Sequence, residues 1–173
     1  MQQTLTAESF GERLRRRMRN AMRRVSALSH SLHPPVSVGM APEPQILTVT
    51  ADADFYSGVL CAAQACGWNA EWARSVKRAV EIGRSRLTPI VIYDCTLPKA
   101  DWRRALDQLS GAPYDVRIFL AAPDVNEDLW QMALHRHGYD VLARSATAAQ
   151  LERELRFAWL SLNQPRNSAL TRA

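Results

Sequence analysis

The chain has 173 residues, of which 47% are hydrophobic and 23% charged, and its formal net charge at pH 7 is +5. This length and apolar content support one well-packed domain with an extension, but hardly two full domains. No apolar run approaches the length of a membrane-spanning helix, and the N-terminus lacks the apolar core of a secretory signal. We therefore expect a cytoplasmic protein without a transmembrane segment.

The sequence holds none of the common signatures of an enzyme or a metal centre. Its three cysteines form no CxxC pair and no Cys/His ligand pattern, which is typical of reduced thiols in the cytosol. No glycine-rich phosphate loop and no Ser-His-Asp or nucleophile-elbow pattern occurs. We therefore expect no metal site, no cofactor and no enzymatic activity.

The basic charge lies in the first 40 residues, which hold seven arginines against Glu8 and Glu12. Residues 1–33 are predicted to contain an amphipathic helix that begins with a capping box and stops before two prolines. Its apolar residues recur every three or four positions, a heptad seam typical of a short coiled coil or a docking helix. The seam consists of Leu14, Met18, Ala21, Val25, Leu28 and Leu32.

The arginines around this seam leave the partner of the helix open. As solvated flanks of the seam they fit a protein partner, such as a second copy of the chain. Their density also suits the phosphates of a nucleic acid or an anionic membrane surface. The arginines are Arg13, Arg15, Arg16, Arg17, Arg19, Arg23 and Arg24.

From Gln45 onward, apolar runs alternate with helical patterns, which argues for a parallel sheet with crossover helices. Residues 34–44 are predicted to be a Pro-rich linker, residues 45–162 a domain and residues 163–173 a C-terminal tail. The predicted strands lie near 45–50, 70–73, 89–94, 116–121 and 140–143, and the predicted helices near 54–66, 75–84, 101–109, 125–136 and 147–162. These units predict an α/β, flavodoxin-like (βα)5 doubly wound fold with strand order 2-1-3-4-5.

The third predicted strand is apolar from residue 89 to residue 93 and runs into Asp94. Such a run is typical of a central strand that is buried on both faces. The turn residues that follow, with Pro98 among them, take the chain out of the sheet. Because ligands of open α/β sheets bind at the carboxyl ends of strands, Asp94 is the first candidate functional residue.

The order of these elements, and an Asp that is followed four residues later by a Pro, resemble the receiver domain of bacterial response regulators. The resemblance covers residues 45–162 and implies that Asp94 is equivalent to the phosphoacceptor of the family. At four other site positions the sequence departs from the family. Thr50 and Ala51 stand in place of an acidic pair, Ala121 in place of a Ser or Thr, and Arg144 in place of a Lys.

These departures point to an atypical, or pseudo, receiver domain. A receiver needs Mg²⁺ for phosphotransfer, and this ion prefers carboxylate and phosphate oxygens as ligands. With Thr50 and Ala51 in place of the acidic pair, we expect weak Mg²⁺ binding. Without a hydroxyl at Ala121, the resemblance implies that the switch of the family is missing. Arg144 preserves a positive charge near Asp94, so we expect a standing salt bridge between the two.

The resulting hypothesis is a non-enzymatic regulatory module of two-component signalling that acts by protein contact and does not depend on phosphorylation. One alternative is a working phosphoacceptor response regulator that uses Asp94. Another is a nucleic-acid-binding regulator that uses the N-terminal arginine helix.

The last predicted helix indicates where protein contact takes place. Phe157 and Leu160 fall outside its apolar stripe, so we expect both to be exposed in an isolated domain. Exposed apolar pairs often mark an interface, and the resemblance implies a dimer or output surface in this region. The alternative is that residues 163–173 fold back and cover both side chains. With the seam of the arginine helix, this pair predicts a homodimer.

Overall fold

The computed structural model describes residues 44–163, and residues 1–43 and 164–173 lie outside this description. The predicted arginine helix of residues 1–33 and its seam therefore fall outside the described residues. The same holds for nearly all of the predicted linker and of the C-terminal tail.

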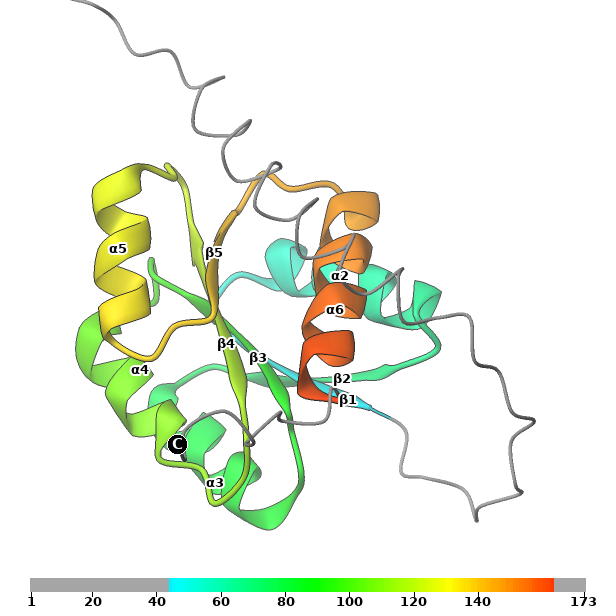
Figure 1. The fold of residues 1–173 in the computed structure, drawn as a ribbon, viewed down its shortest axis with the longest axis horizontal. Helices are drawn as coiled ribbons and strands as arrows, with labels where there is room; N and C mark the ends of the chain where they lie inside the picture. Colours follow the sequence, from blue (N-terminus) through cyan, green and yellow to red (C-terminus); the bar gives the residue numbers. More distant parts are fainter. Residues whose placement is uncertain (1–43, 164–173) are drawn as a thin grey trace, which may run out of the picture. The chain divides into compact units, whose positions relative to one another are not determined.

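The described residues form one sheet of five strands between two layers of helices (Figure 1). The strands are all parallel and lie in the order β2-β1-β3-β4-β5. This order confirms the predicted flavodoxin-like (βα)5 fold. The strands are β1 (Gln45–Val49), β2 (Asn69–Ala73), β3 (Ile90–Asp94), β4 (Arg117–Ala122) and β5 (Asp140–Ala143).

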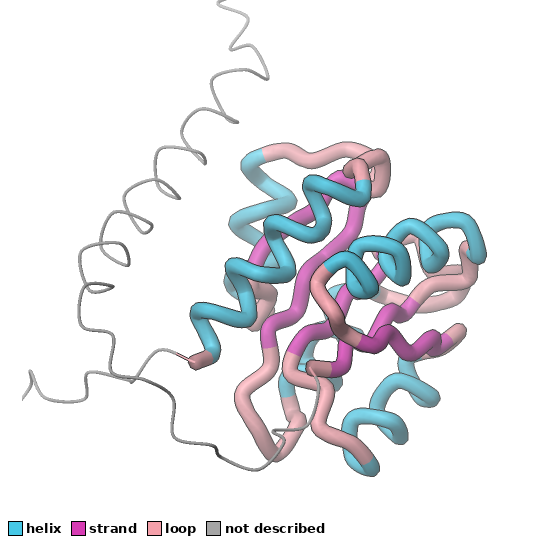
Figure 2. The backbone as a smooth tube through the Cα atoms, turned by 90° about the vertical axis from the view of Figure 1, so that its right-hand side faces the viewer, coloured by secondary structure: helices cyan, strands magenta, loops and turns pink. Residues whose placement is uncertain are grey.

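The helices cover both faces of the sheet, as the view turned by 90° shows (Figure 2). On one face α2 and α6 lie side by side and bury one set of strand side chains. On the other face α3, α4 and α5 bury the alternate set. The helices are α2 (Ala53–Ala65), α3 (Val76–Ser85), α4 (Trp102–Ser110), α5 (Glu127–His135) and α6 (Ala148–Leu162).

The central strand β3 explains why its sequence is apolar without interruption. Every residue of β3 is buried, because Val91 and Tyr93 face α3 and α4 while Ile90 and Ile92 face α2 and α6. The buried position of β3 also brings Asp94, its last residue, to the carboxyl edge of the sheet with 1% of its surface exposed.

The ends of helix α2 follow from local sequence. Asp52 is its N-cap, and the Asp52 side chain accepts hydrogen bonds from the backbone N–H groups of Asp54 and Phe55. At the other end Gly67 has a φ of 75°, in the left-handed region that favours glycine. The helix therefore stops at the predicted place, and its N-terminus is fixed beside the end of β1.

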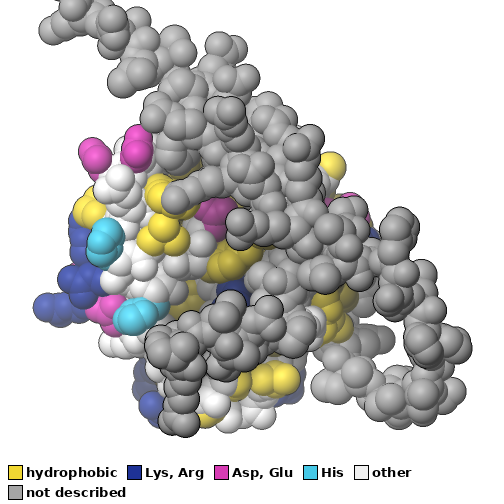
Figure 3. Space-filling model, viewed as in Figure 1, with side chains coloured by type: hydrophobic (Ala, Val, Ile, Leu, Met, Phe, Trp, Pro, Cys, Tyr) yellow, Lys and Arg dark blue, Asp and Glu magenta, His cyan; other side chains and the backbone are white. Residues whose placement is uncertain are grey.

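The described domain carries a balanced charge. Between Gln45 and Leu162 the sequence has 13 basic and 14 acidic residues, and on the α4–α5 side of the face in Figure 3 both signs are interspersed. The basic excess of the chain therefore belongs to its other residues. Within residues 44–163 no helix has both the length and the apolar character that crossing a bilayer requires.

Candidate functional site

The candidate site lies at the carboxyl edge of the sheet, where the chain leaves β1, β3, β4 and β5. In the register of the sheet, Asp94 at the end of β3 is opposite Ala121 of β4. Thr50 follows directly after β1, the other neighbour of β3. This parallel packing brings side chains from distant parts of the sequence around one carboxylate.

Both oxygens of the Asp94 carboxylate accept hydrogen bonds from hydroxyl groups. The hydroxyl of Thr50 donates to Oδ2 at 2.7 Å. The hydroxyl and the backbone N–H of Thr96 donate to Oδ1 at 2.7 and 3.0 Å. Since the residue is only 1% exposed, these donors replace the water that an ionised carboxylate would otherwise require.

Thr50 connects Asp94 with two further segments. Its hydroxyl oxygen accepts the N–H of Asp52 at 3.0 Å, so the start of α2 is tied to the same group. Its backbone carbonyl accepts the indole N–H of Trp72, in the edge strand β2, at 2.8 Å. Thr50 is therefore a fully buried residue that bridges three segments of the domain.

Arg144, directly after β5, divides its guanidinium between two carboxylates. Its Nη2 donates to Oδ2 of Asp52 at 2.5 Å. Its Nε lies 3.4 Å from Oδ1 of Asp94, but among the described residues this buried nitrogen has no hydrogen bond of good geometry. The expected ion pair between Arg144 and Asp94 is thus present as a charge contact, while the directed hydrogen bond goes to Asp52.

The surroundings shift the pKa values of two neighbouring groups. The backbone hydrogen bond from Phe55 lowers the pKa of Asp52, and the hydrogen bond from Arg144 acts in the same direction. Burial raises the pKa of the Cys95 thiol, and the adjacent Asp94 carboxylate raises it further. Both effects disfavour the thiolate, which is the nucleophilic form of a cysteine.

The remaining predicted site residues take different positions. Ala51 is exposed. Ala121 is fully buried, and its backbone carbonyl accepts the N–H of Cys95 at 2.9 Å. Its methyl side chain offers no hydroxyl to Asp94. On α6, Leu160 is 54% exposed as expected.

The expectation that Phe157 is exposed is wrong, because this residue is half-buried. The buried stripe of α6 is formed by Leu151, Leu155 and Ala158. With 3.6 residues per turn, Leu160 lies about half a turn from this stripe, whereas Phe157 lies about a third of a turn from it. The smaller angle leaves Phe157 closer to the covered side of the helix.

Three contributors to the site were not among the predicted site residues: Asp52, Thr96 and Trp72. Asp52 had a recognisable signal, since an Asp just before a predicted helix is a preferred N-cap. Thr96, two residues after Asp94, also fits the local turns that Asp side chains form. Trp72 gave no local signal, because its bond to Thr50 depends on the pairing of β1 with β2.

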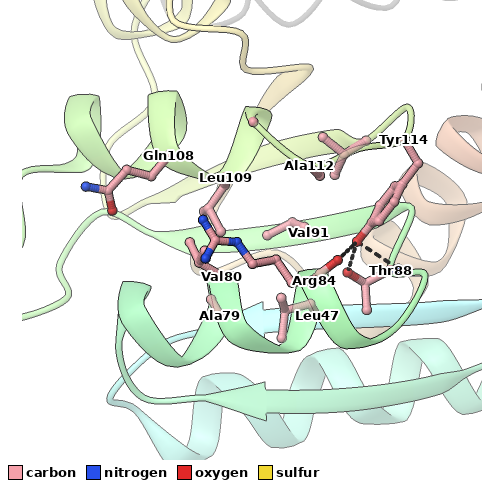
Figure 4. A pocket seen from close by; sticks show the side chains of 13 residues that line it. Leu47, Ala79, Val80, Arg84, Thr88, Val91, Gln108, Leu109, Ala112 and Tyr114 are labelled. Atoms are coloured by element: carbon pink, nitrogen blue, oxygen red, sulfur yellow. Dashed lines mark hydrogen bonds between the residues drawn. The ribbon is translucent and has the colours of Figure 1, made fainter.

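Described residues line a cavity at each end of the sheet. Beside Arg144, an open cavity of about 540 Å³ is lined by residues of α2 and of the loops after β4 and β5. At the amino end, between α3 and α4, a cavity of about 50 Å³ lies under the hydroxyl of Tyr114 (Figure 4). Only the first has the size of a ligand pocket. Within residues 44–163, no group of three His, Cys, Asp or Glu side chains could hold a metal ion.

Solved structures with a similar fold include receiver domains. A two-component response regulator from Clostridium difficile has a TM-score of 0.65 at 15% identity, over 70% of this chain and 100% of that one. The signal receiver domain of an HD domain-containing protein from Pseudomonas fluorescens Pf-5 has a TM-score of 0.64 at 20% identity, over 73% and 93%. The beryllofluoride-activated NtrC4 receiver domain dimer has a TM-score of 0.63 at 14% identity, over 68% and 98%.

No family model matches the sequence, and no curated protein matches it. The likeness therefore concerns the backbone. Residues 44–163 have the fold of a response-regulator receiver domain.

Proposed function

We propose that this domain is a regulatory signalling module that acts through protein contacts and does not depend on phosphorylation of Asp94. The observation that carries the proposal is the closed state of the Asp94 carboxylate. It is 1% exposed, and both of its oxygens already accept hydrogen bonds from Thr50 and Thr96.

Phosphotransfer to a carboxylate needs an accessible oxygen and a cation that neutralises the incoming phosphoryl group. In this site the hydroxyl of Thr50 occupies Oδ2, and Arg144 lies over Oδ1. To reach Asp94, a phosphoryl donor would have to break these contacts and leave buried hydroxyls without partners. Thr50 brings no negative charge that would hold Mg²⁺ in compensation.

The direct test is to incubate the full chain with Mg²⁺ and acetyl phosphate, and in parallel with beryllofluoride. We expect no mass increase of the intact protein and no change in the amide spectrum around Asp94. Asp94→Asn serves as the control for modification elsewhere. A phosphoryl group that appears on the wild type and is absent from Asp94→Asn would instead establish a phosphoacceptor response regulator.

The contact surface that we propose lies on α6 and includes Leu160. Leu160 is a large apolar side chain that is 54% exposed, and such side chains favour burial against a partner. We propose that this partner is a second copy of the chain. The chain offers a matched control, because Leu87 in the loop between α3 and β3 is 55% exposed. The same substitution can therefore be made at equal exposure on a different surface.

Light scattering on the full chain, on Leu160→Glu and on Leu87→Glu tests this surface. We expect Leu160→Glu to shift the protein toward the monomer, because a charge would be buried in the contact. Leu87→Glu should leave the association unchanged. If the two variants associate to the same extent, α6 is not the contact surface.

A further inference from the structure

The open cavity beside Arg144 lies next to the Asp94 site but is separate from it. Its walls come from the start of α2, from Pro123 after β4 and from the turn between β5 and α6. Asp94 is not among its lining residues, because Arg144 stands between the two. The volume of about 540 Å³ lies within the range of small-molecule pockets, roughly 300–1,000 Å³.

The lining of the cavity combines an apolar floor with a few polar groups. Phe55 and Leu151, both nearly buried, form part of the floor together with Ala146 and Pro123. The polar groups are Asp52, Asp54, Arg144 and Ser145. An apolar cavity with few convergent polar groups is the usual form of a site for a small organic ligand.

The charges around the cavity determine the sign of its ligand. Arg144 is the only cation among the lining residues, and it is shared between Asp52 and the buried Asp94. Asp54 is exposed, and its carboxylate makes no hydrogen bond or ion pair with any described residue. The lining of the cavity thus holds two carboxylates and one guanidinium, and Asp54 is the carboxylate that this guanidinium leaves unpaired.

We infer that this cavity binds a small organic cation, an amine on a short aliphatic chain, with the ammonium group at Asp54 and the chain against the apolar floor. The carboxylate excess attracts a cation and repels organic anions. A bare metal ion would lack ligands, since the described residues offer no set of three metal-binding side chains here. This inference rests on the cavity alone and holds whether or not the domain acts through protein contacts.

The test uses the full chain, labelled with ¹⁵N, and three probes of similar size: n-butylamine, butan-1-ol and butanoate. We expect saturable amide shifts with n-butylamine at millimolar concentration, centred on Gly58, Ser145 and Ala146. Butanol and butanoate should give weaker shifts or none. Equal response to the alcohol and the amine would overturn the inference, and so would an absence of saturation.

A charge-matched pair of variants completes the test. Asp54→Asn removes the free carboxylate of the cavity, whereas Asp124→Asn removes an exposed carboxylate just outside it. We expect Asp54→Asn to raise the Kd for n-butylamine about threefold to fivefold, the usual worth of one exposed charge pair. Asp124→Asn should leave the Kd unchanged. An equal increase of the Kd in both variants would show only a general attraction of the amine to a negative surface. The proposal of a binding site would then be wrong.

Discussion

At each end of the sheet one polar side chain makes several hydrogen bonds: the Asp94 carboxylate at the carboxyl end and the Tyr114 hydroxyl at the amino end. At the carboxyl end the Asp94 carboxylate accepts hydrogen bonds from Thr50 and Thr96 and lies beside Arg144. At the amino end the Tyr114 hydroxyl lies within hydrogen-bond distance of Thr88 (Figure 4). It is also within hydrogen-bond distance of the carbonyls of Gly83 and Arg86.

The difference between the two ends lies in what happens when the central group is lost. A hydroxyl that is removed leaves neutral partners, some of which can reach water. A buried carboxylate that is removed leaves hydroxyls and a guanidinium that were arranged around a negative charge. The carboxyl end is therefore the more costly to disturb and the more sensitive to charge.

The largest expected effect is that of Asp94→Ala. The substitution should lower the free energy of unfolding by about 3–5 kcal/mol, because Arg144 and two hydroxyls lose their buried partner. Asp94→Asn keeps the shape and one acceptor oxygen, so its loss should be about 1–3 kcal/mol. Urea denaturation of the full chain measures both. A loss below about 1 kcal/mol for Asp94→Ala would show that the network is dispensable.

Thr50→Asp tests whether the site is closed because of this residue. The variant places a second carboxylate against Asp94, and we expect a loss on the order of 2–4 kcal/mol from the repulsion. Added Mg²⁺ should restore part of this loss, because two carboxylates can hold the ion. The wild type should show no shift in Tm with Mg²⁺ under the same conditions. A stabilising Mg²⁺ effect on the wild type would contradict our interpretation of the site.

Tyr114→Phe removes the neutral group at the other end. We expect a loss of about 1–3 kcal/mol, since the buried N–H of Thr88 and the carbonyl of Gly83 lose a partner. Tyr56→Phe is the matched control, with a single hydroxyl bond to Ala70. A loss for Tyr114→Phe no larger than that for Tyr56→Phe would contradict this interpretation of the amino end.

Asp140, at the start of β5, is a carboxylate at the amino end of the sheet, and it can be compared directly with Asp94 at the carboxyl end. Burial raises its pKa, so the folded protein holds a proton there that the unfolded chain releases. Stability is then lost as the pH rises from the ordinary value of 3.8 through the raised pKa. We expect Asp140→Asn to raise Tm at pH 7 and to bring no gain near pH 3. The amide can still accept the indole N–H of Trp130, which donates to Oδ1 at 2.8 Å.

The fold was predictable from the sequence because each element carries its own signal. The apolar run that ends at Asp94 and the stop at Gly67 are local patterns with a direct physical reason. The network around the site is not local. The Thr50–Asp94 bond joins residues 44 positions apart, and the Asp52–Arg144 pair joins residues 92 positions apart. Which donor meets which oxygen depends on side-chain geometry that spacing alone does not contain.

The division of Arg144 between two carboxylates gives the site two different responses to ionic strength. The Asp52 side chain is 42% exposed, so salt should screen its attraction to the guanidinium over distances of about 10 Å at 0.1 M. Asp94 is 1% exposed, and dissolved ions cannot come between it and the same guanidinium. Concentrated salt should therefore loosen the outer partner and leave the inner one in place. The start of α2 would keep its cap, because the other oxygen of Asp52 holds the backbone of that helix.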